Sequence, residues 1–159
     1  MADLMLNITI ICIAKTKEKY FIEPFQEYKK RLLPYANINL KEIPACKLTN
    51  TNNISMVKKE EGKKILKAIN PAHAVIILSE DGMQASSEDF AKHMINWQEK
   101  GSLQFIIGGA YGLDEEVKKS ANMLLSFSKM TFTHEMIRVF LVEQIYRAFM
   151  INNNKKYHY

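Results

Sequence analysis

The stretch LQFIIGGAYGL, residues 103–113, contains the clearest fold signal in the chain. Its first five residues are mostly apolar, which is typical of a strand buried on both faces of a sheet. Gly108 and Gly109 end that run abruptly, and Asp114 offers the N-cap of a short helix that we expect to reach residue 122. The segment therefore predicts a strand, a glycine loop and a helix in succession.

Four other apolar runs predict strands, and four stretches with helically spaced apolar residues predict helices. The predicted strands are residues 7–14, 38–43, 72–78 and 123–127. The predicted helices are residues 17–33, 56–69, 87–100 and 134–151. Ser86 or Ser87 would cap the third of these helices, and Glu80-Asp81-Gly82 predicts a turn after the strand at 72–78. Pro24 indicates that the first helix either begins near it or is kinked.

The alternation of strands and helices defines the expected fold class. Strands that are apolar throughout, and do not alternate between apolar and polar residues, are typical of a parallel sheet covered on both sides. We therefore expect an α/β fold with a mostly parallel sheet and helices on both faces. The chain has 159 residues, close to the usual size of one domain, so we expect a single domain over residues 1–159.

Composition excludes several classes of protein. Hydrophobic residues make up 47% of the chain and charged residues 25%, which excludes a disordered or fibrous protein. Lys and Arg number 22 against 17 Asp and Glu, and the net charge of +5 is compatible with a polyanionic partner without requiring one.

Cysteine usage and hydropathy point to the compartment. Two cysteines, Cys12 and Cys46, are too few for a metal cluster and make a poor disulfide framework, so we expect no metal and a reducing compartment. Cys12 lies in an apolar run and is expected to be a small buried residue. The first residues lack the basic charge of a signal peptide, and no apolar run approaches the roughly 20 residues of a membrane span. These features predict a cytoplasmic protein without a membrane partner.

The glycine loop is a candidate ligand site. Ligands of open parallel sheets bind beyond the carboxyl ends of the strands, where Gly108, Gly109 and Gly112 would lie. Glycines there let the backbone approach a ligand closely. The loop lacks the Lys and Ser/Thr of a P-loop and the spacing of a dinucleotide fingerprint, which argues against ATP hydrolysis. A tight turn that binds nothing would have the same residues.

A second candidate loop follows the last predicted strand. Hydroxyl and apolar side chains alternate there, a mixture that suits a purine ring and its ribose. An unliganded loop pinned to the core by its apolar residues would give the same pattern. The residues are Ser126, Phe127, Ser128, Lys129, Met130, Thr131 and Phe132.

The last predicted helix is apolar on nearly every side. Only Arg138, Glu143, Gln144 and Arg147 interrupt the sequence MIRVFLVEQIYRAFMI. Such a helix must be covered on several sides, so we expect a homodimer interface, with a buried helix of a monomer as the alternative. The basic and aromatic tail at residues 155–159 could bind phosphate and stack on a base, or could be a frayed terminus.

These stretches together resemble a known family. IGGAYGL at 107–113, LSFSKMTFTHEMIRVFLVEQIYRAF at 125–149 and the pair Tyr157-His158 closely resemble the RlmH family of small SPOUT-class methyltransferases. The resemblance covers essentially the full chain, including NITIICIAKTKEKY at 7–20. It implies a trefoil-knotted α/β fold, a homodimer and S-adenosylmethionine as methyl donor. The implied reaction is N3-methylation of a pseudouridine in bacterial 23S rRNA within the assembled ribosome.

The resemblance also assigns residues to the two halves of a site. The implied donor site contains Leu78, Gly108, Gly109, Phe127, Ser128, Lys129, Met130, Thr131 and Phe132. The residues expected near the target base are Arg138, Glu143, Arg147, Tyr157 and His158. Methylation requires N3 to lose a proton, so we expect Arg138 or Arg147 to stabilise the anion. His158 or a water held by Glu143 would accept the proton.

The chain departs from the family pattern at three places. Thr133 stands where the family has a proline, Tyr111 lies between the glycines, and the tail reads Lys156-Tyr157-His158-Tyr159. Three rival functions therefore stay open: a methyltransferase that acts on tRNA or another rRNA nucleotide, a ribosome-binding module that has lost catalysis, and a flavodoxin-like nucleotide-binding domain.

Overall fold

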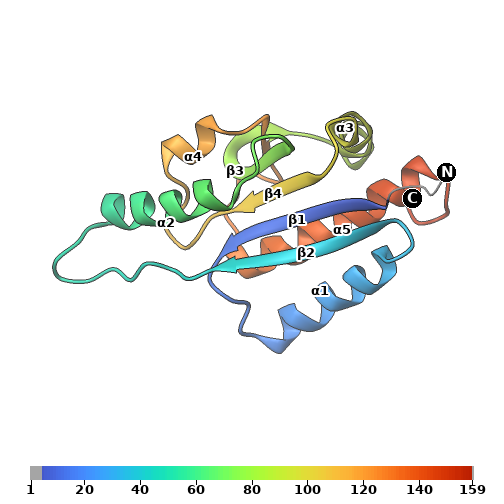
Figure 1. Ribbon diagram of the computed structural model, residues 1–159. Helices are drawn as coiled ribbons and strands as arrows, with labels where there is room; N and C mark the ends of the chain where they lie inside the picture. Colours follow the sequence, from blue (N-terminus) through green and yellow to red (C-terminus); the bar gives the residue numbers. More distant parts are fainter. Residues whose placement is uncertain (1–4, 159) are drawn as a thin grey trace.

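The computed structural model describes residues 5–158, in which the chain forms five strands and five helices (Figure 1). The strands are β1 (Leu6–Ile13), β2 (Ala36–Ile43), β3 (Ala74–Gln84), β4 (Leu103–Ile107) and β5 (Met123–Ser126). The helices are α1 (Lys19–Leu32), α2 (Ile54–Ala68), α3 (Ser87–Gln98), α4 (Glu115–Lys119) and α5 (His134–Asn152). All the predicted strands and helices are present, including the short helix after Asp114, with boundaries shifted by a few residues.

The five strands form one sheet in the order β2-β1-β4-β3-β5. Every neighbouring pair is parallel, which confirms the predicted fold class. Because β4, β3 and β5 are neighbours and run parallel, their carboxyl ends meet at one edge of the sheet. The trefoil knot implied by the family resemblance stays a prediction.

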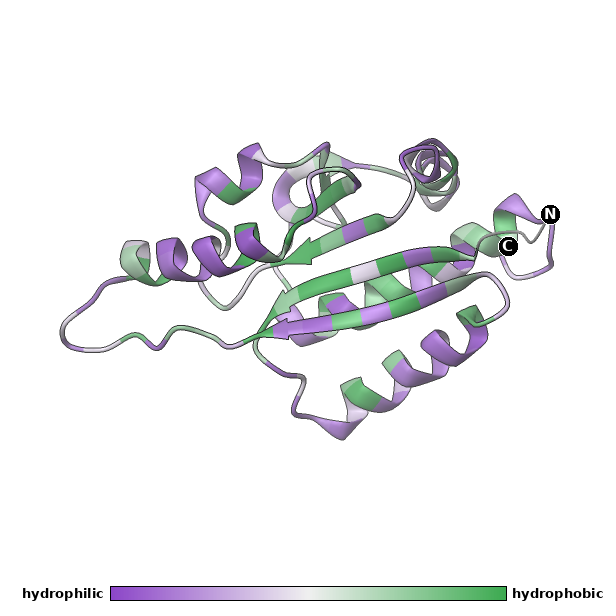
Figure 2. Cartoon of the chain, viewed as in Figure 1, coloured by the Kyte–Doolittle hydropathy of each residue, from purple (hydrophilic) through white to green (hydrophobic). Residues whose placement is uncertain are grey.

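Helices cover both faces of this sheet. On one face, α1, α3 and α5 pack on alternate residues of the strands, including Ile10 and Phe105. On the other face, α2 and α4 pack on the intervening residues, including Ile11 and Ile106. β1 and β4 are therefore buried on both sides and are largely apolar, whereas the outer sides of α1 and α2 are hydrophilic (Figure 2).

Helix caps form where the sequence predicts them. The Ser86 hydroxyl accepts a hydrogen bond from the amide of Asp89 at 3.1 Å, and the Asp114 carboxylate accepts one from the amide of Glu116 at 3.0 Å. Pro24 is different, because α1 begins five residues earlier, at Lys19, and contains the proline. Its missing amide removes the hydrogen bond that would otherwise reach the carbonyl of Tyr20.

The predicted turn at residues 80–82 does not end β3. The strand pairs with Leu125 of β5 at Leu78 and again at Met83, so the chain bulges outward between those residues and then resumes pairing. Gly82 makes this bulge possible, since a Cβ there would lie 2.7 Å from backbone atoms of Leu125. The signal for a bend was correct, and its interpretation as the end of the strand was wrong.

Most of the apolar surface of α5 is buried against other helices and strands of the same chain. Leu141, Val142 and Ile145 are buried in the core shared with α1 and α3. A smaller apolar surface stays exposed around Phe140 and the preceding Phe132, whose rings meet edge to face at 5.4 Å. Among residues 5–158, no helix is both long and apolar enough to cross a membrane.

Candidate functional site

A cleft of about 1010 Å³ opens at the carboxyl ends of β3, β4 and β5. Two loops form most of its wall, the glycine loop at residues 108–113 and the loop after β5 at residues 127–133, together with the flanking Ser126 and His134. Eight of the nine predicted donor residues line it: Leu78, Gly108, Gly109, Phe127, Ser128, Met130, Thr131 and Phe132. Lys129 is the exception: it is exposed and does not contribute to the lining.

The glycine loop packs its backbone directly on the elements behind it. A Cβ on Gly109 would lie 3.0 Å from Cγ2 of Ile13 and 3.1 Å from Oε2 of Glu61. The amide of Gly112 donates to the carbonyl of Gly109 at 3.2 Å and closes a turn. The space behind the loop is therefore tight for any side chain at position 109, and a glycine there lets the loop pack closely against Ile13 and Glu61.

The loop after β5 is held by its own hydroxyls. Ser126 donates to the carbonyl of Ser128 at 2.8 Å, and the Ser128 hydroxyl accepts from the amide of Met130 at 2.9 Å. Thr133 caps α5 with its hydroxyl and has a φ of −61°, within the range that a proline would enforce. The loop therefore keeps a proline-like backbone at this departure from the family pattern.

An ion pair at the rim of the cleft was missed by sequence reasoning. Lys118 of α4 donates to Asp81 of the β3 bulge at 2.8 Å, and both residues line the cleft. The hydrogen bond from Lys118 holds the pKa of Asp81 below its usual range. The two residues are 37 positions apart, so no local pattern could have indicated the pair.

A second cavity of about 560 Å³ adjoins the cleft. The two share a wall made of Leu125, Ser126, Phe127 and Phe132. Besides Ser126, the polar residues that line the second cavity are Tyr28, Ser86, Ser87, Glu143 and Gln144, and apolar residues of α3 and α5 complete the lining. The cleft and the second cavity thus form adjacent compartments with the loop after β5 between them.

Four of the five residues predicted near the target base meet beside this second cavity. Glu143 accepts from Arg147 at 2.5 Å and from the Tyr157 hydroxyl at 3.1 Å, and Arg147 donates to Nδ1 of His158 at 3.2 Å. The Arg147 guanidinium also lies 4.8 Å from the centre of the Tyr157 ring. We call these four residues, together with Tyr28 and Glu88, the tail cluster.

The donors and acceptors that each side chain of the tail cluster offers determine which atoms carry the protons. Arg147 can only donate, so Nδ1 of His158 must accept, and the proton of His158 lies on Nε2, which donates to Glu88 at 2.7 Å. Tyr157 has one proton and gives it to Glu143, so Tyr28 donates to Tyr157 at 3.1 Å. Burial, followed by these hydrogen bonds and the Glu143 charge, raises the pKa of Tyr157 above its usual range.

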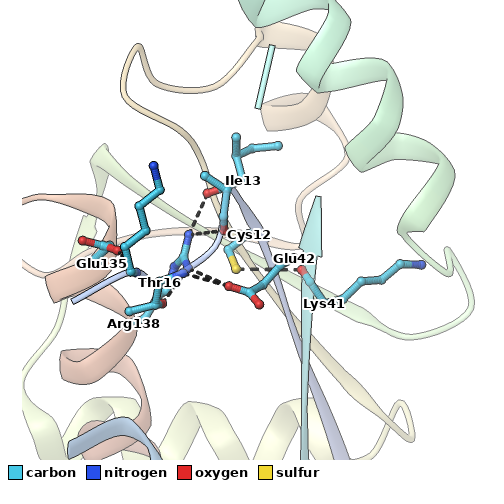
Figure 3. Close-up of polar contacts among 9 residues, drawn as sticks. Cys12, Ile13, Thr16, Lys41, Glu42, Glu135 and Arg138 are labelled. Carbon is cyan, nitrogen blue, oxygen red and sulfur yellow. Dashed lines mark hydrogen bonds and ion pairs between the residues drawn. The ribbon is translucent and has the colours of Figure 1, made fainter. Parts of the chain in front are cut away.

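Arg138 lies apart from the tail cluster, although it shares helix α5 with Glu143 and Arg147 of that cluster. Its side chain is 1% exposed, and Nη2 donates to the carbonyls of Ile13 at 2.6 Å and Ala14 at 2.9 Å (Figure 3). Nη1 donates to the Thr16 hydroxyl at 2.8 Å and pairs with Glu42 at 3.4 Å. The hydrogen bonds of the guanidinium are thus used at the end of β1. The pKa of the partly buried His134 is lowered, mainly by burial and to a smaller extent by the positive charge of Arg138.

Sequence reasoning missed the partners that hold the tail. Glu88 and Ser87 lie in the first turn of α3, and Tyr28 belongs to α1. Ser87 donates to Gln144 at 2.8 Å, which donates in turn to Glu143 at 3.0 Å. The contacts of Ser87 with Gln144 and of Glu88 with His158 join residues far apart in sequence, and only the N-cap pattern at Ser86-Ser87 gave a local signal. Tyr159, the last residue of the predicted tail, lies outside the described residues.

The arrangement suits transfer of a group between two bound molecules. One compartment has backbone, hydroxyl and apolar walls, and the other adjoins a cationic and carboxylate cluster.

Within residues 5–158 no group of three or more His, Cys, Asp or Glu side chains is placed to hold a metal ion. Cys12 is buried, and burial raises the pKa of its thiol to about 11.

Comparison with known proteins identifies relatives across nearly the whole chain. Residues 6–158 match a family described as predicted SPOUT methyltransferase. The chain is 43% identical over 159 residues to the ribosomal RNA large subunit methyltransferase H of Bifidobacterium animalis subsp. lactis, with 96% of this chain and 99% of that protein covered. Proteins of the same name from Lactobacillus delbrueckii subsp. bulgaricus and Caldicellulosiruptor saccharolyticus are 41% and 43% identical over 158 and 152 residues. They cover 96% and 95% of this chain, and 99% of each relative is matched.

Proposed function

This chain belongs to the SPOUT methyltransferase family and, within it, to the RlmH group, and we propose that it methylates N3 of a pseudouridine in bacterial 23S rRNA with S-adenosylmethionine as donor. The observation that carries this proposal is the pair of adjacent compartments. The large cleft lies at the strand ends where parallel sheets bind their ligands. The second cavity shares its wall and includes Glu143 of the tail cluster.

The cleft fits a nucleoside-containing methyl donor. Its glycine loop lines the cleft with Gly108, Gly109 and Gly112, and the loop after β5 adds hydroxyls and aromatic walls. In the proposal, Leu78, the glycine loop and residues 127–132 hold S-adenosylmethionine. When bound, this donor supplies an electrophilic methyl group on a sulfonium.

Arg147 is the better candidate to stabilise the N3 anion. Both candidates are cations of α5, but the hydrogen bonds of Arg138 are committed to backbone carbonyls and Glu42, and its side chain is buried. Arg147 is one-quarter exposed and is joined to Glu143, which lines the second cavity. A positive charge there would favour loss of the N3 proton.

The proton acceptor is assigned to a water held by Glu143. Both ring nitrogens of His158 are engaged, one by Arg147 and the other by Glu88, so the imidazole has no free acceptor in this arrangement. Glu143 lines the second cavity directly. In this assignment Tyr157 and His158 orient Glu143 and Arg147, and neither takes up the proton.

The proposal includes a homodimer that meets at the exposed side of α5. Phe132 and Phe140 are 40% and 38% exposed and border both the second cavity and this surface. Burial of these rings against a second copy would stabilise a two-fold interface. Sedimentation should detect a dimer, and Phe140→Glu should convert it to a monomer, whereas exposed Tyr20→Glu on α1 should not. A monomeric wild-type chain would contradict this part of the proposal.

The experiment that tests the function is methyl transfer from labelled S-adenosylmethionine. Assembled ribosomes, free 23S rRNA and tRNA are offered side by side, and the label is mapped by mass spectrometry. Label at a pseudouridine of the large subunit would support the proposal, including action on ribosomes in the cytoplasm. Label in tRNA or at another nucleotide would favour a different RNA substrate.

Two further outcomes would point to a role other than methyl transfer. A folded protein that binds ribosomes but neither binds nor uses the donor would be a non-catalytic module. A purified protein with the yellow colour of a bound flavin would point to a flavodoxin-like role, and this inspection can precede the assay.

A further inference from the structure

Glu61 is a buried acid behind the cleft that the proposed reaction does not use. It lies in α2, on the opposite side of the glycine loop from the cleft, and its side chain is 4% exposed. Oε1 accepts a hydrogen bond from the amide of Cys46 at 3.1 Å. Oε2 is buried as well and has no hydrogen-bond partner among residues 5–158. A carboxylate placed in this way is costly, so its position requires an explanation.

The position of Oε2 relates Glu61 to the glycine loop. A Cβ on Gly109 would lie 3.1 Å from this oxygen, so the carboxyl group stands directly behind the loop backbone. The same Cβ would lie 3.0 Å from Cγ2 of Ile13, which flanks this space from the side of β1. Glu61 therefore joins two segments: it accepts a hydrogen bond from Cys46 in the connection after β2, and it fills the space behind Gly109 of the glycine loop.

From this geometry we propose that Glu61 is a positioning residue for methyl-donor binding, which acts by holding the glycine loop in the shape that receives the donor. The proposal rests on the proposed function, because it assumes that the cleft binds S-adenosylmethionine. Burial raises the pKa of Glu61 above its usual range, in agreement with a group that acts through shape and one accepted hydrogen bond.

Three substitutions at Glu61 distinguish the effect of the length of its side chain from the effect of its charge. Glu61→Gln keeps the length and the accepting oxygen and removes the charge. Glu61→Asp keeps the charge but is one methylene too short to touch both segments, and Glu61→Ala removes both. Val57→Ala is the matched control, since Val57 is buried on the same face of α2 one turn earlier and its side chain cannot hydrogen-bond to the loop.

Calorimetry with S-adenosylmethionine gives the first readout. We expect Glu61→Ala and Glu61→Asp to raise the donor Kd about tenfold or more, and Glu61→Gln to stay within about threefold of wild type. Val57→Ala should lower the melting temperature while its donor Kd changes less than about twofold. Equal donor Kd values for Glu61→Ala and Val57→Ala would overturn the proposal, as would a Glu61→Gln variant as weak as Glu61→Ala.

Amide hydrogen exchange without any donor gives the second readout. Glu61→Ala should speed exchange in residues 44–47 and 107–112 more than elsewhere, whereas Val57→Ala should not single out these two segments. Uniform exchange in both variants would also overturn the proposal. If wild type itself failed to bind S-adenosylmethionine, the proposed function would be wrong, and the exchange comparison would still decide whether Glu61 holds the loop.

Discussion

Arg138 of α5 donates a hydrogen bond to the carbonyl of Ala14 at 2.9 Å. Among residues 5–158, Ala14 and Asn154 are the two non-glycine residues with a positive φ. Ala14 has a φ of 68°, a conformation that costs a residue with a Cβ about 1–2 kcal/mol. The buried guanidinium also binds the carbonyl of Ile13, so the turn at the end of β1 is fixed by a side chain 124 residues away. Arg138 thus holds together the two ends of the fold.

Replacement of Arg138 should therefore affect stability strongly. Arg138→Met fills a similar volume but removes the guanidinium from the carbonyls of Ile13 and Ala14 and from the Glu42 carboxylate, and we expect it to reduce the free energy of unfolding by about 3–5 kcal/mol. Urea unfolding monitored by circular dichroism measures this change. Arg31→Met is the control, because Arg31 is exposed and pairs with Glu27 on the surface of α1, where little stability is expected to be lost. A loss below about 1 kcal/mol at Arg138 would refute the structural role.

A side chain at Gly109 should abolish donor binding. The space behind this residue is already occupied by Ile13 and Glu61, so Gly109→Val must push the loop toward the cleft. We expect the Kd for S-adenosylmethionine to rise at least about tenfold, with a smaller rise for Gly109→Ala. Calorimetry provides the Kd, and a melting curve reports whether the variant is folded. Near-normal affinity in folded Gly109→Val would show that the glycine loop does not contact the donor.

Loss of Arg147 should reduce turnover more than donor affinity. The guanidinium is joined to Glu143 beside the second cavity and does not line the cleft. Arg147→Ala should lower kcat on ribosomes about a hundredfold or more, while the donor Kd stays within about twofold. Lys92→Ala, at an exposed ion pair on α3, serves as the control and should change neither quantity. Equal losses in turnover and donor affinity would move Arg147 out of the target-base site.

Alkaline pH should loosen the tail cluster. The pKa of Tyr157 is raised in the folded protein, so its contribution to stability is complete below the ordinary tyrosine pKa of about 10 and is lost as the pH rises above that value. The difference in unfolding free energy between wild type and Tyr157→Phe should therefore shrink as the pH increases from about 9 to 11. Tyr20→Phe, at an exposed position on α1, should show a difference near zero throughout. A constant difference for Tyr157→Phe would contradict the prediction.

The features predicted correctly from the sequence are those determined by neighbouring residues. The apolar run of β4, the glycines after it and the caps at Ser86 and Asp114 all depend on contacts within a few positions. The bulge in β3 depends instead on β5, which pairs with it on both sides of the excursion. No local pattern distinguishes such a bulge from a turn that ends the strand.

The residues of the candidate site likewise fall into those predicted from local sequence and those that depend on distant partners. Eight of the predicted donor residues lie together in one cleft, because they belong to a strand end and two continuous loops at the same edge of the sheet. The sequence could not separate Arg138 from Arg147, since both are isolated cations on an apolar helix and differ only in which distant carbonyls and carboxylates they meet. Glu61 and Glu88 likewise have the sequence context of ordinary surface acids, and only their distant partners distinguish them.

The position of β4 between β1 and β3 determines when the protein can fold. β1 and β2 can pair early, but the central strand of the sheet ends only at Ile107, so the middle of the sheet must wait for a contact between segments more than 90 residues apart. Contacts of this separation slow folding, because the entropy cost of closing the long intervening loop is met before the contact becomes stabilising. On the ribosome, the chain would leave its half-built sheet exposed until most of it had been synthesised, and α5 would then close the fold last.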